Sequence, residues 1–326
     1  MEGIIIQRMN MTTTQSSPVA LNTSALDGVA HLTHLGLIKV EGEDAAKFIH
    51  GQLTQDFSLL DLNTARLAAF CSPKGRMLAS FIGFKRSNNE IWLICSHDIL
   101  APTLKRLSMF VMRAKARLSD VTADYAIYGL AGSATKPIAA GSHLTGAKSD
   151  VGDCTLVNLH PADSTPRQLW VAPVAEPQPE GPALPLATWL WGDVRSGVAT
   201  ITAPVVDAFV PQMLNYESVG GVNFKKGCYP GQEVVARSQF RGTLKRRAFV
   251  AHADVEMASG LEIFTANDDS QPVATVVQAA AAPNGGFDAI ISGQLSAIEL
   301  GAMRLGSNAG ASLQVLPLPY ALLDDI

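Results

Sequence analysis

The sequence has few cysteines, few aromatic side chains and no long apolar run. Its four cysteines stand singly, without a C-x-x-C pair or a histidine at zinc-ligand spacing: Cys71, Cys95, Cys154 and Cys228. This pattern argues against a disulfide framework and against a zinc site. No stretch approaches the roughly 18 apolar residues of a membrane helix, and the first residues lack the layout of a secretory signal. These absences predict a cytoplasmic protein with reduced thiols and no membrane partner.

The chain has 326 residues, which is more than one hydrophobic core usually serves. With 47% hydrophobic residues, it can build several cores. The net charge of −4 argues against a protein built wholly to coat nucleic acid. Residues 1–17 are mostly polar and predict a disordered tail, followed by two or three domains.

Residues 18–120 predict a first α/β domain. The apolar run from Leu35 to Val40 predicts a strand, and Asp44 is placed to cap a helix whose apolar residues reach Leu53. Apolar runs on both sides of Pro73-Lys74-Gly75-Arg76 indicate a hairpin. A strand at 90–96 and a helix over about 98–112 complete the domain.

Residues 121–242 predict a second α/β domain, and residues 243–326 a β-barrel. Short strand-like runs and a helix in ATWLWGDVRSG fill the second domain. After Arg247 the pattern is almost wholly strand-like, with no helix long enough to shelter the sheet edges. Closure into a barrel would remove those edges.

The stretch KKGCYPGQE at 225–233 places a thiol between glycines. Pro230 cannot lie inside a helix, so a helix is expected to start near Gly231, just after Cys228. A helix N-terminus and the nearby cations Lys226 and Arg237 favour the thiolate, which is the nucleophilic form. Cys228 is therefore the candidate catalytic thiol, and the other three cysteines are expected to be structural.

Basic residues crowd around this thiol, with Glu233 as the only acid among them. They are Lys225, Lys226, Arg237, Arg241, Lys245, Arg246 and Arg247. The cluster is either a solvated basic face or a contact for an anionic ligand or partner.

The segment FVPQMLNYESVGGVNFKKGCYPGQEVVARSQFRGTLKRR resembles the YgfZ family of folate-binding, tRNA-modification and iron-sulfur maintenance proteins. SPKGR in the hairpin, GEDAAKFIHGQLTQD and VLPLPY extend the resemblance over the chain from about Leu35. It implies an α+β, aminomethyltransferase-like fold: two α/β domains and a C-terminal β-barrel around a central channel that holds a reduced folate.

The resemblance implies an accessory protein for iron-sulfur cluster assembly or repair, with Cys228 as its reactive thiol. Its implied partners are tetrahydrofolate or another reduced folate and iron-sulfur enzymes such as tRNA-thiolating radical enzymes, with tRNA as a further candidate. An aminomethyltransferase-like enzyme and a plain RNA-binding module are the alternatives. The first alternative lacks an expected acid, since PKGRMLASFIGFKRSNN contains no carboxylate.

Candidate folate contacts follow from the resemblance and from the chemistry of the ligand. Trp189 either binds the pterin ring or packs in the core with Leu190. Gln212 and Asn215 either bond the pterin edge or tie down a loop. Gln232 and Glu233 contact folate or serve the first turn of the helix. The cations and the loop tyrosine complete the set: Lys226, Tyr229, Arg237 and Arg241, with the two arginines suited to the glutamate tail. No metal ligand is predicted.

Two residues depart from the family pattern. Arg195 stands where relatives commonly have a glutamate associated with the pterin, so the charge is reversed there. Leu35 stands where some relatives have an aromatic residue, so an aliphatic wall is expected at that side of the ring pocket.

Overall fold

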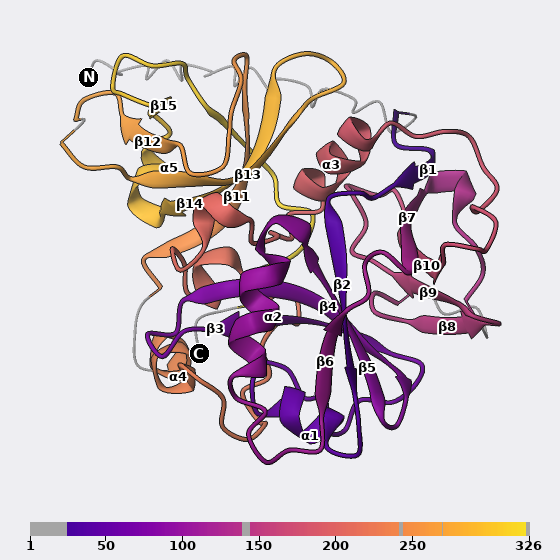
Figure 1. The fold of residues 1–326 in the computed structure, drawn as a ribbon. Helices are drawn as coiled ribbons and strands as arrows, with labels where there is room; N and C mark the ends of the chain where they lie inside the picture. Colours follow the sequence, from indigo (N-terminus) through magenta and orange to yellow (C-terminus); the bar gives the residue numbers. More distant parts are fainter. Residues whose placement is uncertain (1–24, 139–143, 241–243, 269, 324–326) are drawn as a thin grey trace, which may run out of the picture.

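The computed structural model describes residues 25–138, 144–240, 244–268 and 270–323. The expected tail at 1–17 lies outside this range, as does Arg241. Three antiparallel sheets with a few short helices form the described chain (Figure 1). Among these helices, none is long and apolar enough to cross a membrane.

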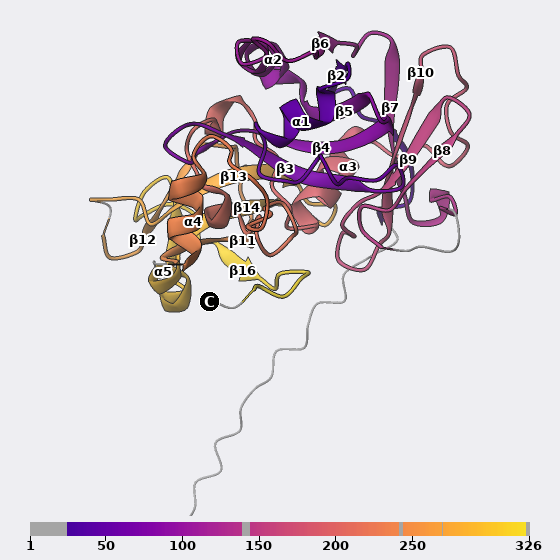
Figure 2. The same ribbon diagram turned by 90° about the horizontal axis from the view of Figure 1, so that it is seen from below.

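The first sheet has five strands in the order β3-β4-β5-β2-β6. Their bounds are β2 Leu35–Glu41, β3 Ala65–Cys71, β4 Met77–Ser87, β5 Glu90–Ser96 and β6 Arg117–Asp120. The predicted hairpin joins β3 to β4. Helices α1 (Ala45–His50) and α2 (Leu100–Ser108) lie on one face of this sheet, and the third sheet lies on the other side (Figure 2).

The helix expected after Asp44 is α1, but Asp44 does not cap it with its side chain. Its carboxylate accepts a hydrogen bond from Lys115 N at 2.8 Å instead. The helix ends at His50, before Leu53, whose amide still bonds Ile49 O at 3.0 Å. A contact with the distant segment before β6 has thus replaced a local cap.

The second sheet has the order β1-β7-β10-β9-β8. Its strands are β1 Gly28–His31, β7 Tyr125–Ala131, β8 Lys148–Val151, β9 Cys154–Asn158 and β10 Arg167–Pro173. Strand β1 precedes every strand of the first sheet in the sequence, yet it pairs with β7 in the second. The chain therefore ties these two sheets together at its start.

The third sheet follows α4 (Gln232–Phe240) and has the order β15-β12-β13-β14-β11-β16. Its strands are β11 Arg246–Ala253, β12 Glu262–Thr265, β13 Ala274–Ala281, β14 Phe287–Gln294, β15 Met303–Leu305 and β16 Gln314–Leu316, with α5 (Leu295–Leu300) after β14. The sheet curls, and a bridge between Arg304 and Ser312 links β15 to the residues just before β16. The sequence predicts a β-barrel here, and the structure has a sheet that curls into a half-barrel.

Helix α3 (Leu186–Arg195) packs against β13, β14 and β1, between the second and third sheets (Figure 1). Trp191 Nε1 donates to Asp288 Oδ2 at 2.8 Å, and Arg195 pairs with Asp163 at 2.9 Å and with Asp288 at 3.5 Å. One continuous apolar core includes residues of all three sheets, such as Phe81, Leu169 and Ile290.

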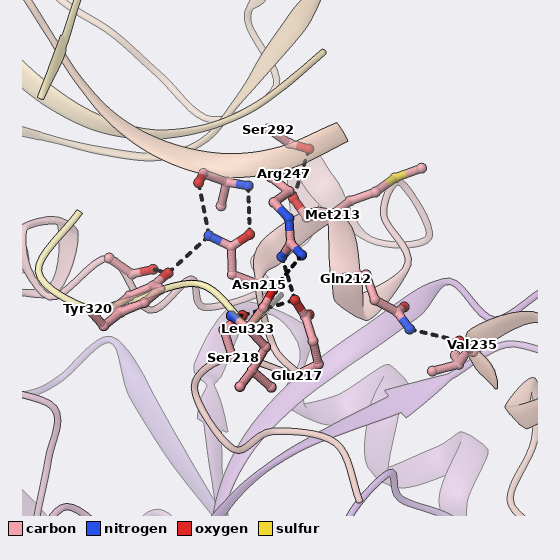
Figure 3. Close-up of polar contacts among 12 residues, drawn as sticks. Gln212, Met213, Asn215, Glu217, Ser218, Val235, Arg247, Ser292, Tyr320 and Leu323 are labelled. Atoms are coloured by element: carbon pink, nitrogen blue, oxygen red, sulfur yellow. Dashed lines mark hydrogen bonds and ion pairs between the residues drawn. The ribbon is translucent and has the colours of Figure 1, made fainter. Parts of the chain in front are cut away.

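The segment at 211–221 is fastened to β11 by buried polar contacts (Figure 3). Asn215 has a left-handed φ of 58° and exchanges two hydrogen bonds with the Ala248 backbone, at 2.9 and 3.2 Å. Arg247 Nη1 bonds Glu217 Oε1 at 2.5 Å, and the two side chains are only 5% and 0% exposed. These contacts fix the path of the chain before it enters the cysteine loop.

Replacing Arg247 by Met is expected to lower the free energy of unfolding by about 3–5 kcal/mol, because Glu217 must then remain buried without its cation or take up a proton. Urea denaturation measures the loss. Lys115→Met is the matched control, since Lys115 and Glu43 form an ion pair with side chains 72% and 71% exposed. Exposed pairs contribute little, so this variant should unfold close to wild type. Equal, small losses in both variants would contradict the role of the buried pair.

Candidate functional site

The cysteine loop is anchored by the buried Lys226. Its ammonium donates to two carbonyls at the end of α1, His50 O and Leu53 O, the second at 2.6 Å. It also lies 4.8 Å from the centre of the Tyr229 ring. Burial lowers the pKa of Lys226 from 10.5 to about 8, although electrostatic interactions with Asp56 and Cys228 oppose this shift. Lys226 therefore keeps its charge at pH 7, beside the thiol.

The hairpin turn and the start of α4 touch through two glycines with positive φ. Gly75 has φ 72° and Gly231 has φ 79°. A Cβ on Gly231 would lie 2.7 Å from Gly75 Cα and 2.4 Å from Ser72 O. A side chain at either position would collide with the opposite segment. The motifs SPKGR and KGCYPGQE can therefore pack against each other only because both positions are glycine.

The cysteine predictions are confirmed as far as burial is concerned. Cys228 is exposed, and the other three are buried. Burial raises the pKa of Cys71 and of Cys95 to about 12, and it also raises the pKa of Cys154. Helix α4 begins at Gln232, as expected from Pro230 and Gly231.

The side chains of His50 and Asp56 form a pair beside the cysteine loop. His50 Nδ1 is 3.0 Å from Asp56 Oδ1, and a Cβ on Gly227 would be 3.4 Å from His50 Nε2. Sequence spacing does not reveal this neighbour, because His50 comes from α1 and reaches the loop only in the fold.

A cavity of about 640 Å³ lies where the three sheets meet. Strands β3, β4 and β5 of the first sheet line it, together with β9, β10, α3 and β13. Aliphatic residues such as Leu35, Leu67 and Ile82 form part of its wall, and an aliphatic side chain at Leu35 is expected from the sequence. Its volume and apolar wall are typical of small-molecule sites.

Four charged side chains and three histidines line this cavity. Its carboxylates are Asp98 and Asp193, and its cations are Arg66 and Arg167. Burial lowers the pKa of the lining imidazoles His34 and His160, which favours their neutral forms. Nδ1 of His34 is buried without a hydrogen-bond partner among the described residues.

Trp189 lines the cavity but offers little of its ring face. A Cβ on Gly129 would lie 2.4 Å from the indole, and the Arg167 guanidinium lies 4.9 Å from the ring centre. The side chain is 1% exposed. Trp189 therefore packs in the core and can present only an edge to a ligand.

Gln212 and Asn215 do not line the cavity. Gln212 Nε2 donates to Val235 O at 2.7 Å, and the Asn215 amide is taken up by Ala248 and Tyr320 (Figure 3). Both side chains are completely buried. In this structure they tie down the segment that leads to the loop.

The predicted contacts on the loop and α4 also lie outside the cavity lining: Lys226, Tyr229, Gln232, Glu233 and Arg237. Glu233 and Arg237 form an exposed i,i+4 ion pair on α4. Arg247 is buried, and Arg246 donates to Ser292 O and Pro272 O. Within the described part of the cluster, Lys226 and Arg247 are therefore structural, whereas Lys225, Arg237 and Lys245 are exposed.

A second cavity of about 500 Å³ lies between the first cavity and the loop. Arg66 lines both, and Lys225 and Asp56 line the second. Val219 and Gly220 line the first cavity and Val222 to Lys225 the second, so one segment passes both before it reaches Cys228.

Sequence reasoning missed Arg167 and Asp193 as cavity residues. Asp193 follows Trp189 by four residues in the predicted helix, a spacing that places both on one face. Arg167 is the first residue of β10, and the residues next to it in the sequence do not indicate that it contacts Trp189 and Asp193 in the fold.

The family model described as the GCVT N-terminal domain matches residues 20–150. The tRNA-modifying protein YgfZ of Edwardsiella ictaluri (strain 93-146) is 30% identical over 309 residues, covering 87% of this chain and 89% of the relative. The protein of the same name from Yersinia pestis (strain Pestoides F) is 28% identical over 329 residues, covering 95% and 96%.

Among solved structures, the glycine cleavage system aminomethyltransferase T from Bartonella henselae matches with a TM-score of 0.66 and 13% sequence identity. The match covers 92% of this chain and 88% of that chain. At this identity the likeness concerns the fold alone, and it confirms the expected aminomethyltransferase-like architecture.

In the native protein, iodoacetamide is expected to modify Cys228 much faster than the other three cysteines at pH 7, because Cys228 is exposed and the others are buried. Peptide mass spectrometry over time gives the rate at each site. In denaturant the four rates should converge, which is the control. Comparable native rates at Cys228 and Cys154 would contradict the assignment of a single reactive thiol.

Proposed function

The chain belongs to the YgfZ family of tRNA-modifying proteins, and from this premise we propose that it is a folate-binding accessory protein for iron-sulfur enzymes that modify tRNA. Cys228 is its reactive thiol, and tetrahydrofolate or another reduced folate is its ligand. The observation that carries the proposal is the cavity where the three sheets meet.

The cavity residues fit a reduced folate. Leu35, Leu67 and Ile82 supply apolar surface for the ring system, and Asp193 supplies a hydrogen-bond acceptor for its polar edge. Arg66 lies where the first cavity meets the second, and Lys225 lies further along. These two cations suit the carboxylates of a glutamate tail directed toward the cysteine loop.

A role without aminomethyl turnover is favoured by strand β4. This strand contributes Ser80, Phe81 and Ile82 to the cavity wall, and no carboxylate occurs between Pro73 and Asn89. An acid that would move a proton near the folate amine is therefore missing from β4. The bound folate is accordingly a ligand in this proposal, and the chemistry takes place on the partner enzyme.

Cys228 suits a transient contact with a soft metal centre or an electrophilic sulfur. It is exposed, and Lys226 lies two residues before it in the same loop. No three His, Cys, Asp or Glu side chains gather in a metal-binding arrangement in the described part of the chain. Cys228 would thus supply one ligand, and the partner enzyme would supply the others.

Tetrahydrofolate is expected to bind the wild-type protein saturably in calorimetry. Arg66→Glu should weaken binding several-fold, and more strongly for a triglutamate form, because the reversed charge repels the tail carboxylates. Arg117→Glu is the matched control, since Arg117 is an exposed arginine outside both cavities. Absence of saturable binding at hundreds of micromolar tetrahydrofolate would remove folate from the proposal.

In a strain that lacks the gene, Cys228→Ser is expected not to restore thiolated nucleosides in tRNA, whereas Cys154→Ser should restore them. Mass spectrometry of digested tRNA measures the outcome. Full restoration by Cys228→Ser would contradict a reactive role for the thiol. Release of ammonia or methylenetetrahydrofolate from an aminomethylated carrier protein, at a rate proportional to this protein, would instead favour the transferase alternative.

A further inference from the structure

Helix α3 contributes Trp189, Leu190 and Asp193 to the cavity wall, and Trp189 and Asp193 lie one turn apart. Arg167, at the start of β10, joins them: its guanidinium lies 4.9 Å from the Trp189 ring centre, and its Nη1 lies 2.7 Å from Asp193 Oδ1. Arg167 Nε also donates to His160 O at 3.3 Å, and the arginine side chain is only 4% exposed. The carboxylate of Asp193 is therefore held by a cation that is itself fixed from several sides.

Asp193 differs from Asp98, the other carboxylate of the cavity wall, in having one oxygen without a partner among the described residues. Asp98 uses both oxygens within the protein, accepting from Ser96 Oγ at 2.7 Å and from Ala203 N at 2.8 Å. Oδ1 of Asp193 accepts from Arg167, and Oδ2 has no hydrogen bond or ion pair among the described residues. The Asp193 side chain is 18% exposed, so this oxygen is available to a ligand.

Arg195, where the charge is reversed relative to the family pattern, does not line the cavity. Arg195 follows Asp193 by two residues, which on an α-helix turns its side chain roughly 200° away. Its guanidinium binds Asp163 and Asp288 and does not line the cavity. The only carboxylate that α3 offers to a ligand is therefore that of Asp193.

We propose that Asp193, positioned by Arg167, recognises the donor edge of a 2-amino-4-oxo pteridine. This inference rests on the proposed folate ligand and names the group that selects it. The 2-amino group and the adjacent ring N–H are parallel donors, which match the acceptors of a carboxylate. An analogue without the 2-amino group leaves the Asp193 charge incompletely paired in an apolar cavity, and such a site rejects it.

The test compares tetrahydrofolate with its 2-desamino-2-methyl analogue by calorimetry, in the wild type and in Asp193→Asn. The asparagine keeps an oxygen for Arg167 but places an N–H₂ donor toward the ligand donors. Wild type should prefer tetrahydrofolate by about 10- to 100-fold, and the variant should lose this preference. Asp254→Asn, an exposed carboxylate outside both cavities, should behave as wild type.

The outcomes separate this inference from the proposed function. A wild type that binds neither compound overturns the folate ligand and the role of Asp193 together. A wild type that binds tetrahydrofolate, with Asp193→Asn retaining both affinity and preference, overturns only the role of Asp193. If the variant fails to fold, the two compounds are compared on wild type alone, and equal affinities overturn the inference.

Discussion

The buried ion pair between Arg247 and Glu217 holds the third sheet against the segment that builds the candidate site. Asn215, with its left-handed backbone and its two bonds to Ala248, fixes the direction of that segment. From there the chain lines the first cavity at Val219 and Gly220, passes the second, and ends in the loop of Cys228. The positions of the first cavity and of Cys228 therefore depend on this one segment and on the buried polar contacts that hold it to β11.

This arrangement suggests how a bound ligand and an exposed thiol can belong to one function. Lys226 ties the loop to the end of α1, and Arg66 lines both cavities between the loop and the junction of the sheets. An elongated anionic ligand would extend from the apolar cavity toward the loop and stabilise the walls that hold it.

The sequence predicted the elements better than it predicted the cavity. Periodicity and turn residues located α3, α4 and the β3–β4 hairpin, and the apolar strands around Cys71 and Cys95 indicated the burial of these two thiols. Gln212 and Asn215 were suited by chemistry to a ligand edge, but the backbone of α4 and β11 takes up their amides. Arg167 and Asp193 are in contact only because the fold brings β10 and α3 together, and a local sequence pattern cannot predict such a contact.

A crystal structure of the protein grown with tetrahydrofolate tests the central claim most directly. The account predicts the pteridine ring in the cavity between the three sheets, with its 2-amino edge at Asp193 and its tail passing Arg66 toward the second cavity. A pteridine bound elsewhere on the protein, or a cavity without ligand density at saturating tetrahydrofolate, would contradict it.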